Sequence, residues 1–337
     1  MLSERFLRRI DKIQRPEEAQ RYLRSDRCWR PEVVEGLLRR ADKLVSLTPK
    51  AALGIAEIAL TIVNRLRVPS RELQAHALCS VATAQRYLGK LREAESHFYQ
   101  AEKLSQGGSA SLTAMIARQK ALLCVDQGDL AFALKLARKA VKLDRGTGIF
   151  PTKSLLIEGI VVGFRNEISA SEACFTQVLE HEDPAGDDYL FATNNLVRTI
   201  LKRPLLVAEI LEARKTIRRL QERIRGIRET PVRYTFWYLE GLLHGLMEEY
   251  RLAAKHIEQG RAGFLRMGMV PDYARVSVDL VDVLIKKGGV EKARLVMQET
   301  AEHLSASEEG KTLAEIFQLA HGEPVETVVG LLRARIV

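Results

Sequence analysis

Apolar and polar positions alternate along this chain with a helical period, and the pattern recurs. In the segment 89–101, GKLREAESHFYQA, the apolar residues Leu91, Ala94, Phe98 and Ala101 follow one another at intervals of three or four residues. This spacing places them on one face of a helix. Another apolar-periodic segment ends at Gly89. The pattern predicts two antiparallel helices joined by a tight turn at this glycine.

The surroundings of Gly89 recur, which indicates a repeated unit. The six anchor positions of this repeat are Gly89, Gly128, Asn166, Arg203, Glu248 and Gly288, spaced 37–45 residues apart. The residue two positions after each anchor is apolar, and the residue five positions after it is Ala or Ser. Small residues allow two helix backbones to approach closely. Because one hairpin cannot bury its own apolar stripe, the hairpins are expected to stack.

The repeated unit resembles the tetratricopeptide repeat family. The segment 89–101 carries the family's second-helix pattern, and WYLEG at 237–241 carries the Trp and Gly of its first helix. The resemblance covers about residues 71–304, with a longer period than the family's roughly 34 residues and without its closing proline. It implies an all-α, right-handed α-solenoid of about seven stacked antiparallel helix hairpins, whose first helices line a concave groove.

The segments 31–47 and 50–67 predict an earlier, divergent hairpin. Pro31 and Pro49 suit the first turns of these helices, and Thr48 suits an N-cap.

Both ends of the chain are expected to cap the solenoid. Leading helices precede residue 31, and closing helices are predicted over 310–321 and 323–335. We therefore expect capping segments at 1–30 and 305–337 around one continuous solenoid at 31–304.

The N-terminal segment has an apolar stripe and a basic face. The stripe comprises Leu2, Phe6, Ile10 and Ile13. A helix docked on the first hairpin is favoured, and a helix lying on a membrane surface is the alternative.

Composition limits the compartment and the class of protein. The 337 residues are 46% hydrophobic with a net charge of +9, which permits an acidic partner without requiring one. No apolar run is long enough for a transmembrane helix, and the N-terminus lacks a signal core, so a cytoplasmic location is expected. The resemblance, with its long divergent repeats, implies a bacterial protein. The four cysteines are scattered without a C-x-x-C pair; they are Cys28, Cys79, Cys124 and Cys174. Of these, Cys79, Cys124 and Cys174 lie among apolar and small residues and are interpreted as core residues.

Motifs of catalysis and metal binding are absent from the sequence. The seven histidines form no H-x-x-x-H or H-E-x-x-H pair, and neither G-x-S-x-G nor a phosphate-binding glycine loop occurs. The sequence therefore predicts a protein that is not an enzyme and needs no cofactor or metal.

One long predicted helix within 203–229 has a basic face. Its members are Arg214, Lys215, Arg218, Arg219 and Arg225. This basic patch is interpreted as a solvated face whose aliphatic stems cover the repeat beneath it. The alternative is a surface for an acidic partner.

The family resemblance implies that polar residues of the first helices bind a partner in the groove. The candidates are Thr83, Arg86, Tyr87, Arg118, Gln119, Asn194, Asn195, Arg198, Asp279 and Asp282. The Asn amides can bond the main chain of an extended peptide, and the alternative for them is a capping or loop role. Cys79, Ser80 and Thr83 stand where a carboxylate clamp would need Lys and Asn, which argues against a full clamp.

These observations favour a non-enzymatic scaffold, adaptor or regulatory sensor that binds a protein or peptide segment in its groove, by analogy with the fold. The alternative is a nucleic-acid-binding helical repeat protein that uses its basic helix faces. Aromatic platforms among the arginines, which would support that alternative, are missing from the sequence.

Overall fold

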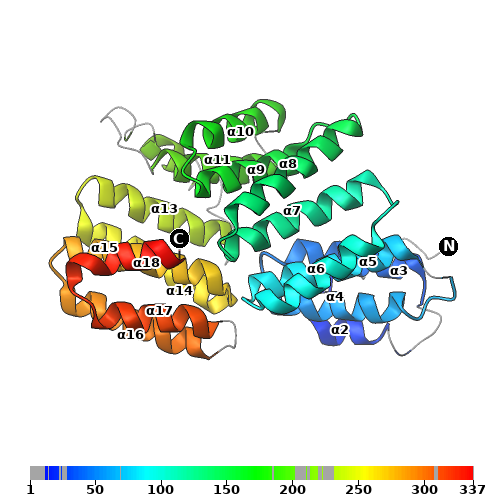
Figure 1. The fold of residues 1–337 in the computed structure, drawn as a ribbon, viewed down its shortest axis with the longest axis horizontal. Coiled ribbons are helices and arrows are strands. Elements are labelled where there is room, and N and C mark those ends of the chain that lie inside the picture. The colour runs from blue at the N-terminus through cyan, green and yellow to red at the C-terminus, as the bar shows by residue number, and fades with distance from the viewer. Residues whose placement is uncertain are drawn as a thin grey trace. The chain divides into compact units, whose positions relative to one another are not determined.

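The computed structural model shows a helical protein in two compact units, residues 1–161 and 162–337 (Figure 1). It describes residues 12–13, 15–22, 24, 29–68, 70–183, 186–201, 210, 213–218, 222, 231–306 and 310–336. Within these residues every regular element is an α-helix, which confirms the all-α helical-repeat prediction. None of these helices combines the length and the hydropathy that crossing a bilayer requires.

The predicted anchors are the turn residues of the hairpins. Five have a left-handed backbone, with φ of 81° at Gly89, 83° at Gly128, 63° at Asn166, 60° at Glu248 and 81° at Gly288. Arg203 lies outside the described residues. The second helix begins two residues after each of these five anchors, at Leu91, Leu130, Ile168, Tyr250 and Val290. The predicted repeat register is therefore confirmed at these five turns.

The first unit contains the early hairpins. Its helices are α2 (Pro16–Gln20), α3 (Pro31–Leu44), α4 (Pro49–Val63), α5 (Arg71–Tyr87), α6 (Leu91–Leu104), α7 (Ala110–Asp126) and α8 (Leu130–Gly146). Helix α9 (Thr152–Phe164) runs from the first unit into the second. Pro31 and Pro49 occupy first turns as predicted. Thr48 is the N-cap residue of α4 as predicted, although its side chain forms no capping hydrogen bond.

The second unit contains the later hairpins. Its helices are α10 (Ile168–His181), α11 (Asp187–Ile200), α13 (Pro231–Leu246), α14 (Tyr250–Met267), α15 (Val270–Lys286), α16 (Val290–Ser305), α17 (Gly310–Gly322) and α18 (Val325–Ile336). The closing helices predicted from the sequence are α17 and α18. Helix α18 packs against both α15 and α17.

Small and apolar residues at fixed offsets from the anchors fill the space between helices. The residues five and nine positions after the described anchors are at most 1% exposed; they are Ala94, Ala133, Ser171, Ala253, Ala293, Phe98, Ala137, Phe175, Ile257 and Met297. At Gly241 on α13, an added Cβ would lie 2.5 Å from Cγ1 of Ile257 on α14. The small residue at this crossing thus lets the two helix backbones approach closely, as the repeat pattern predicted.

Several predictions concern the two ends of the chain. Ile13 is buried, whereas Leu2, Phe6 and Ile10 lie outside the described residues. The division into caps at 1–30 and 305–337 around a solenoid at 31–304 stays a prediction.

Cys79 and Cys124 are buried, as expected of core residues, whereas Cys174 is partly exposed and Cys28 lies outside the described residues. Burial raises the pKa of the Cys124 thiol to about 11 and raises that of Cys79 further, so both stay protonated near neutral pH.

Candidate functional site

A cavity of about 530 Å³ opens within the second unit. Side chains from the end of α9 and from α11, α13, α15 and α18 line it, so the first helices of successive hairpins form most of its wall. We call this cavity the unit-2 groove. Its lining includes Phe164, Arg198, Leu242, Leu246, Tyr238, Arg275, Asp279, Asp282, Val283, Lys286 and Arg333.

Two carboxylates on α15 organise one wall of the groove. Asp279 accepts a hydrogen bond of 2.5 Å from the Tyr238 hydroxyl, and Arg333 lies 3.4 Å from its other oxygen. Asp282 pairs with Arg333 at 3.0 Å and with Lys286 at 2.9 Å. The two carboxylates are thus held by partners from α13, α15 and α18.

The phenol of Tyr238 is held in its neutral form. Burial raises its pKa well above the ordinary value, and the negative charge of Asp279 raises it further. Arg198 and Arg275 oppose this shift without reversing it. Tyr238 therefore acts as a hydrogen-bond donor in the groove, not as a base.

One aromatic ring of the groove lies close to two cations. The guanidinium carbons of Arg198 and Arg275 lie 5.3 Å and 5.1 Å from the centroid of the Phe164 ring. Cation–π attraction of this kind orders the arginine side chains. Arg275 also pairs with Asp272 at 3.5 Å.

The groove has a positive charge excess beside an apolar surface. Its lining contains four cationic side chains and two carboxylates, together with leucine and valine side chains such as Leu242, Leu246 and Val283. Such a surface suits a ligand that carries both apolar groups and an anionic group.

The structure brings three of the predicted groove residues together, namely Arg198, Asp279 and Asp282. Asn194 lies on α11 with its side chain buried, and its Oδ1 has no hydrogen-bond partner among the described residues. Asn195 donates from Nδ2 to the carbonyl oxygen of Phe191 in its own helix, at 2.9 Å. Neither asparagine lines the unit-2 groove.

Two of the predicted groove residues of the first unit, Arg86 and Arg118, form ion pairs between helices of that unit. Arg86 on α5 pairs with Asp126 on α7 at 2.9 Å and lies over the Tyr87 ring. Arg118 on α7 pairs with Asp144 on α8, also at 2.9 Å.

The remaining first-unit candidates, Thr83 and Gln119, are on α5 and α7. Thr83 is buried and donates to the carbonyl oxygen of Cys79, and Gln119 is partly buried. Two of the five candidates, Arg86 and Arg118, therefore join elements of the repeats.

The basic patch is described only in part. Arg214, Lys215 and Arg218 are exposed, whereas Ala213 and Ile217 beside them are buried. Arg219 and Arg225 lie outside the described residues. In the described part, exposed cations thus lie beside buried apolar residues, and the choice between a solvated face and a surface for an acidic partner stays a prediction.

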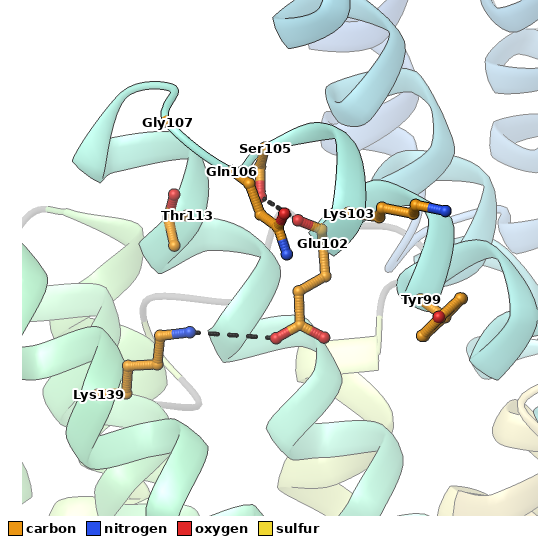
Figure 2. Close-up of a pocket in the computed structure, with 8 residues that line it drawn as sticks. All are labelled: Tyr99, Glu102, Lys103, Ser105, Gln106, Gly107, Thr113 and Lys139. Atoms are coloured by element: carbon orange, nitrogen blue, oxygen red, sulfur yellow. Dashed lines mark hydrogen bonds and ion pairs between the residues drawn. The ribbon is translucent and has the colours of Figure 1, made fainter.

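A smaller cavity of about 400 Å³ lies in the first unit, where α6 turns into α7 (Figure 2). Glu102 crosses it toward Lys139, with 4.0 Å between Oε1 and Nζ, and also pairs with Lys120 at 2.7 Å. Because its carboxylate is already paired with two lysines, this cavity offers a ligand less uncompensated charge than the unit-2 groove.

Several groove residues were not predicted from the sequence. They are Phe164, Tyr238, Arg275, Lys286 and Arg333. Tyr238 lies in the WYLEG segment that carried the family resemblance, so the motif offered a signal for it. Arg275 lies one helical turn before Asp279, so helical periodicity offered a signal for it. Arg333 reaches the groove from the end of the chain, and no local pattern marks it.

Comparison with known proteins identifies the fold. No family profile matches the sequence, and no curated protein matches it. Among the solved structures that match are three with 12–14% sequence identity. A Rap protein complexed with Competence and Sporulation Factor is 14% identical, with a TM-score of 0.63 over 86% of this chain and 80% of that one.

Two further matches are similar in extent. NprR in complex with its cognate peptide NprX is 12% identical, with a TM-score of 0.60 over 85% of this chain and 82% of that one. The Rap conjugation gene regulator of plasmid pLS20, in complex with the Phr* peptide, is 14% identical, with a TM-score of 0.66 over 84% and 75%. The chain thus has the TPR-like helical-repeat fold.

Proposed function

We propose that this TPR-like protein is a non-enzymatic, cytoplasmic regulatory sensor that binds an extended peptide segment in the unit-2 groove. The bound segment carries an anionic group, either an acidic side chain or a terminal carboxylate, beside apolar side chains. A change in the protein's interactions on binding this segment would be the regulatory output.

The unit-2 groove is the observation that carries the proposal. Its volume of about 530 Å³ accommodates several side chains of a peptide. The guanidinium groups of Arg198 and Arg275 both lie close to the Phe164 ring. This contact orders the two cations beside an apolar surface. Guanidinium groups bind carboxylates through charge-assisted hydrogen bonds. The neighbouring leucines supply the apolar contact from which short peptides gain much of their affinity.

The matched structures support a peptide as the ligand. NprR was solved with its cognate peptide, and the plasmid Rap regulator with the Phr* peptide. These ligands belong to those proteins, and their sequences are not carried over to this chain. This chain and the matched structures share the helical-repeat fold. The side chains that line the unit-2 groove would therefore determine which peptide this chain binds.

The experiment is a selection from a random peptide library with free C-termini, using the immobilised full-length chain. Enriched peptides would be synthesised and their affinities measured by fluorescence anisotropy. We expect enrichment of peptides with an acidic residue or a C-terminal carboxylate contact. Phe164→Ala should weaken binding at least about tenfold, since it removes the ring that orders both arginines.

Arg138→Ala is the matched control, since Arg138 is an exposed arginine of the first unit. It should leave the affinity unchanged. Failure to enrich any peptide above an unrelated helical protein would overturn the proposal, and so would equal binding to wild type and Phe164→Ala.

A further inference from the structure

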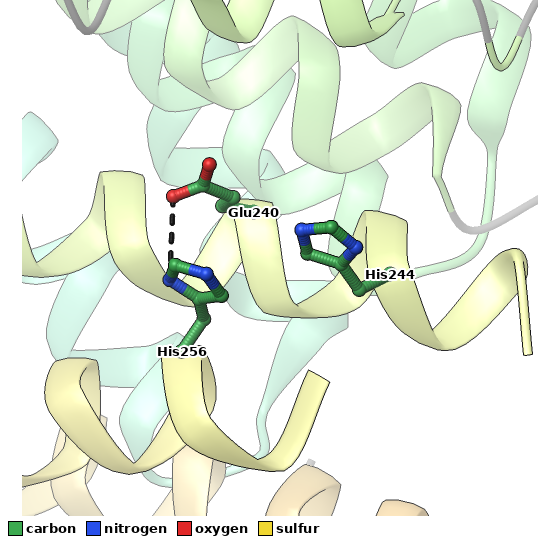
Figure 3. A group of neighbouring side chains, drawn as sticks. All are labelled: Glu240, His244 and His256. Carbon is green, nitrogen blue, oxygen red and sulfur yellow. Dashed lines mark ion pairs between the residues drawn. The ribbon is translucent and has the colours of Figure 1, made fainter. Parts of the chain in front are cut away.

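We propose that Glu240, His244 and His256 form a binding site for a divalent transition-metal ion, with Zn²⁺ as the ion of best fit (Figure 3). One ligand atom from each side chain lies within 4.8 Å of the others. The site lies between α13 and α14 and does not depend on the proposed peptide.

Two rigid helices position the three side chains. Glu240 and His244 are four residues apart on α13 and share one helix face. His256 faces them from α14, in a hairpin whose backbones are held close by Gly241 and by Gly260. At Gly260 an added Cβ would lie 2.9 Å from the carbonyl oxygen of Tyr234. Ligands on such closely packed helices are held more accurately than ligands on loops.

The two imidazoles lie beside each other. Their rings are stacked with centroids 5.4 Å apart and an interplanar angle of 12°. Nδ1 of His244 lies 2.5 Å from Oε2 of Glu249. That nitrogen therefore carries the proton and donates it to the carboxylate, which leaves Nε2 with its lone pair available to a metal. A carboxylate that orients a histidine in this way is the usual outer shell of a metal site.

His256 supplies the second, independent observation. Its Nδ1 is buried and forms no hydrogen bond to any residue that the structure describes. It lies 3.3 Å from Oε2 of Glu240 as an ion pair. Buried polar atoms are nearly always hydrogen-bonded, so an unbonded nitrogen beside a carboxylate needs an explanation. A cation bound by both groups provides one.

The donor set selects the class of metal. Two imidazoles and one carboxylate are ligands of Zn²⁺ and of its neighbours in the first transition row. Mg²⁺ and Ca²⁺ prefer oxygen and would need more oxygen ligands than this cluster offers. Ligand atoms about 2.0–2.2 Å from a tetrahedral ion lie about 3.3–3.6 Å apart. The ligand atoms now lie up to 4.8 Å apart and the two rings are nearly parallel, so the side chains would have to rotate toward a bound ion.

A bound ion would cross-link α13 to α14. The groove residue Tyr238 lies two residues before Glu240, on the same helix. The ion would therefore rigidify the helix that carries one wall of the unit-2 groove, without contacting the groove's ligand.

The test uses the full-length chain, treated with EDTA and then dialysed. Zn²⁺ would be titrated by isothermal calorimetry, and Co²⁺ would be titrated by visible absorption spectroscopy. We expect one ion per chain and a rise in melting temperature with Zn²⁺, because an ion that binds only the folded state stabilises it. His256→Ala should weaken Zn²⁺ binding at least about 100-fold, and Glu249→Gln about 10–100-fold.

His181→Ala is the matched control, since His181 is an exposed helical histidine outside the cluster, and its Zn²⁺ affinity should equal that of wild type. Circular dichroism would check that each variant folds, and His256→Gln replaces His256→Ala if the alanine variant does not. Absence of stoichiometric binding by wild type would overturn the proposal, as would unchanged binding by the His256 variant. A cobalt spectrum with a thiolate charge-transfer band would assign the ion to cysteines and would also overturn it.

Discussion

Nη2 of Arg333 lies 3.0 Å from Oδ2 of Asp282, which joins the last helix of the chain to α15 across 51 residues of sequence. The same guanidinium group reaches Asp279 at 3.4 Å. Through these two contacts α18 contributes to the unit-2 groove. Directly beside Arg333 in sequence, Leu332 is fully buried. Helix α18 is therefore attached by an ion pair and by apolar burial, and the two contributions can be separated.

Replacing these two neighbours should show that apolar burial dominates. Leu332→Ala should lower the free energy of unfolding by about 2–5 kcal/mol, because it leaves a cavity in a packed contact. Arg333→Ala should lower it by less than about 1 kcal/mol, because the arginine side chain is 49% exposed and solvent screens the pair. Urea denaturation of both variants measures the difference. A larger loss for Arg333→Ala would contradict this assignment.

The repeat register predicts the effect of overpacking a helix crossing. Ala133 on α8 is fully buried, whereas Ala131 on the same helix is exposed. Ala133→Leu should cost about 1–3 kcal/mol of stability, because three extra carbon atoms have no room at the crossing. Ala131→Leu should be nearly neutral, and so it serves as the control. Equal melting temperatures for the two variants would reject the register.

Backbone strain at the turns predicts two opposite effects. Glu248 adopts φ of 60°, a region that costs a non-glycine residue roughly 1 kcal/mol or more. Glu248→Gly should therefore stabilise the protein by up to about 1 kcal/mol. Gly128→Ala should destabilise it by about 1 kcal/mol. Nothing lies within 4 Å of the added Cβ, so the cost comes from the left-handed backbone conformation, which alanine disfavours. Thermal melts that changed in the same direction for both variants would disagree with this account.

The sequence predicted the repeat well because its signals are local. Small residues and turn residues recur at fixed offsets. The small residues allow close approach of two helices and the turn residues allow a left-handed backbone, and both requirements arise within one hairpin. The anchor at Asn166 was recognisable without glycine because asparagine tolerates a left-handed backbone. Glu248 was found only through its neighbours, since nothing about glutamate favours that conformation.

The candidate sites were less predictable because they depend on contacts between distant residues. Arg86 and Arg118 have the polarity of ligand-binding residues, yet each pairs with an aspartate of another helix. Glu240 and His244 show a helical spacing, but their third partner lies across a helix crossing at His256. The prediction of no metal rested on motifs within one helix, and the proposed site is divided between two.

The pH response of the groove follows from Tyr238. Because the pKa of its phenol is raised in the folded state, the folded protein retains a proton that the unfolded chain loses above about pH 10. Stability should therefore be unaffected by this group below about pH 10 and should fall as the pH rises above it. Tyr238→Phe should remove this part of the decline. Urea denaturation of the two proteins between pH 8 and pH 11 measures it, and parallel curves would contradict the assignment.

Nucleic-acid binding and groove binding predict different responses to salt and to mutation. Arg214 and Arg218 are exposed and lie outside the unit-2 groove. If the basic patch binds nucleic acid, affinity should fall by roughly 0.7–0.9 log units per contacted phosphate for each log unit of salt. Arg214→Glu with Arg218→Glu should then abolish binding. Filter binding with generic RNA and DNA, from low to physiological salt, measures both effects.

We expect only weak nucleic-acid binding that is lost at physiological salt, because no aromatic platform accompanies these arginines in the described part of the patch. The same double variant should bind a library-selected peptide as wild type does. Arg198→Ala should weaken that peptide at least about tenfold, because it removes one of the two guanidinium groups beside Phe164. Tight nucleic-acid binding that survives physiological salt and disappears in the double variant would instead assign the partner to the basic patch.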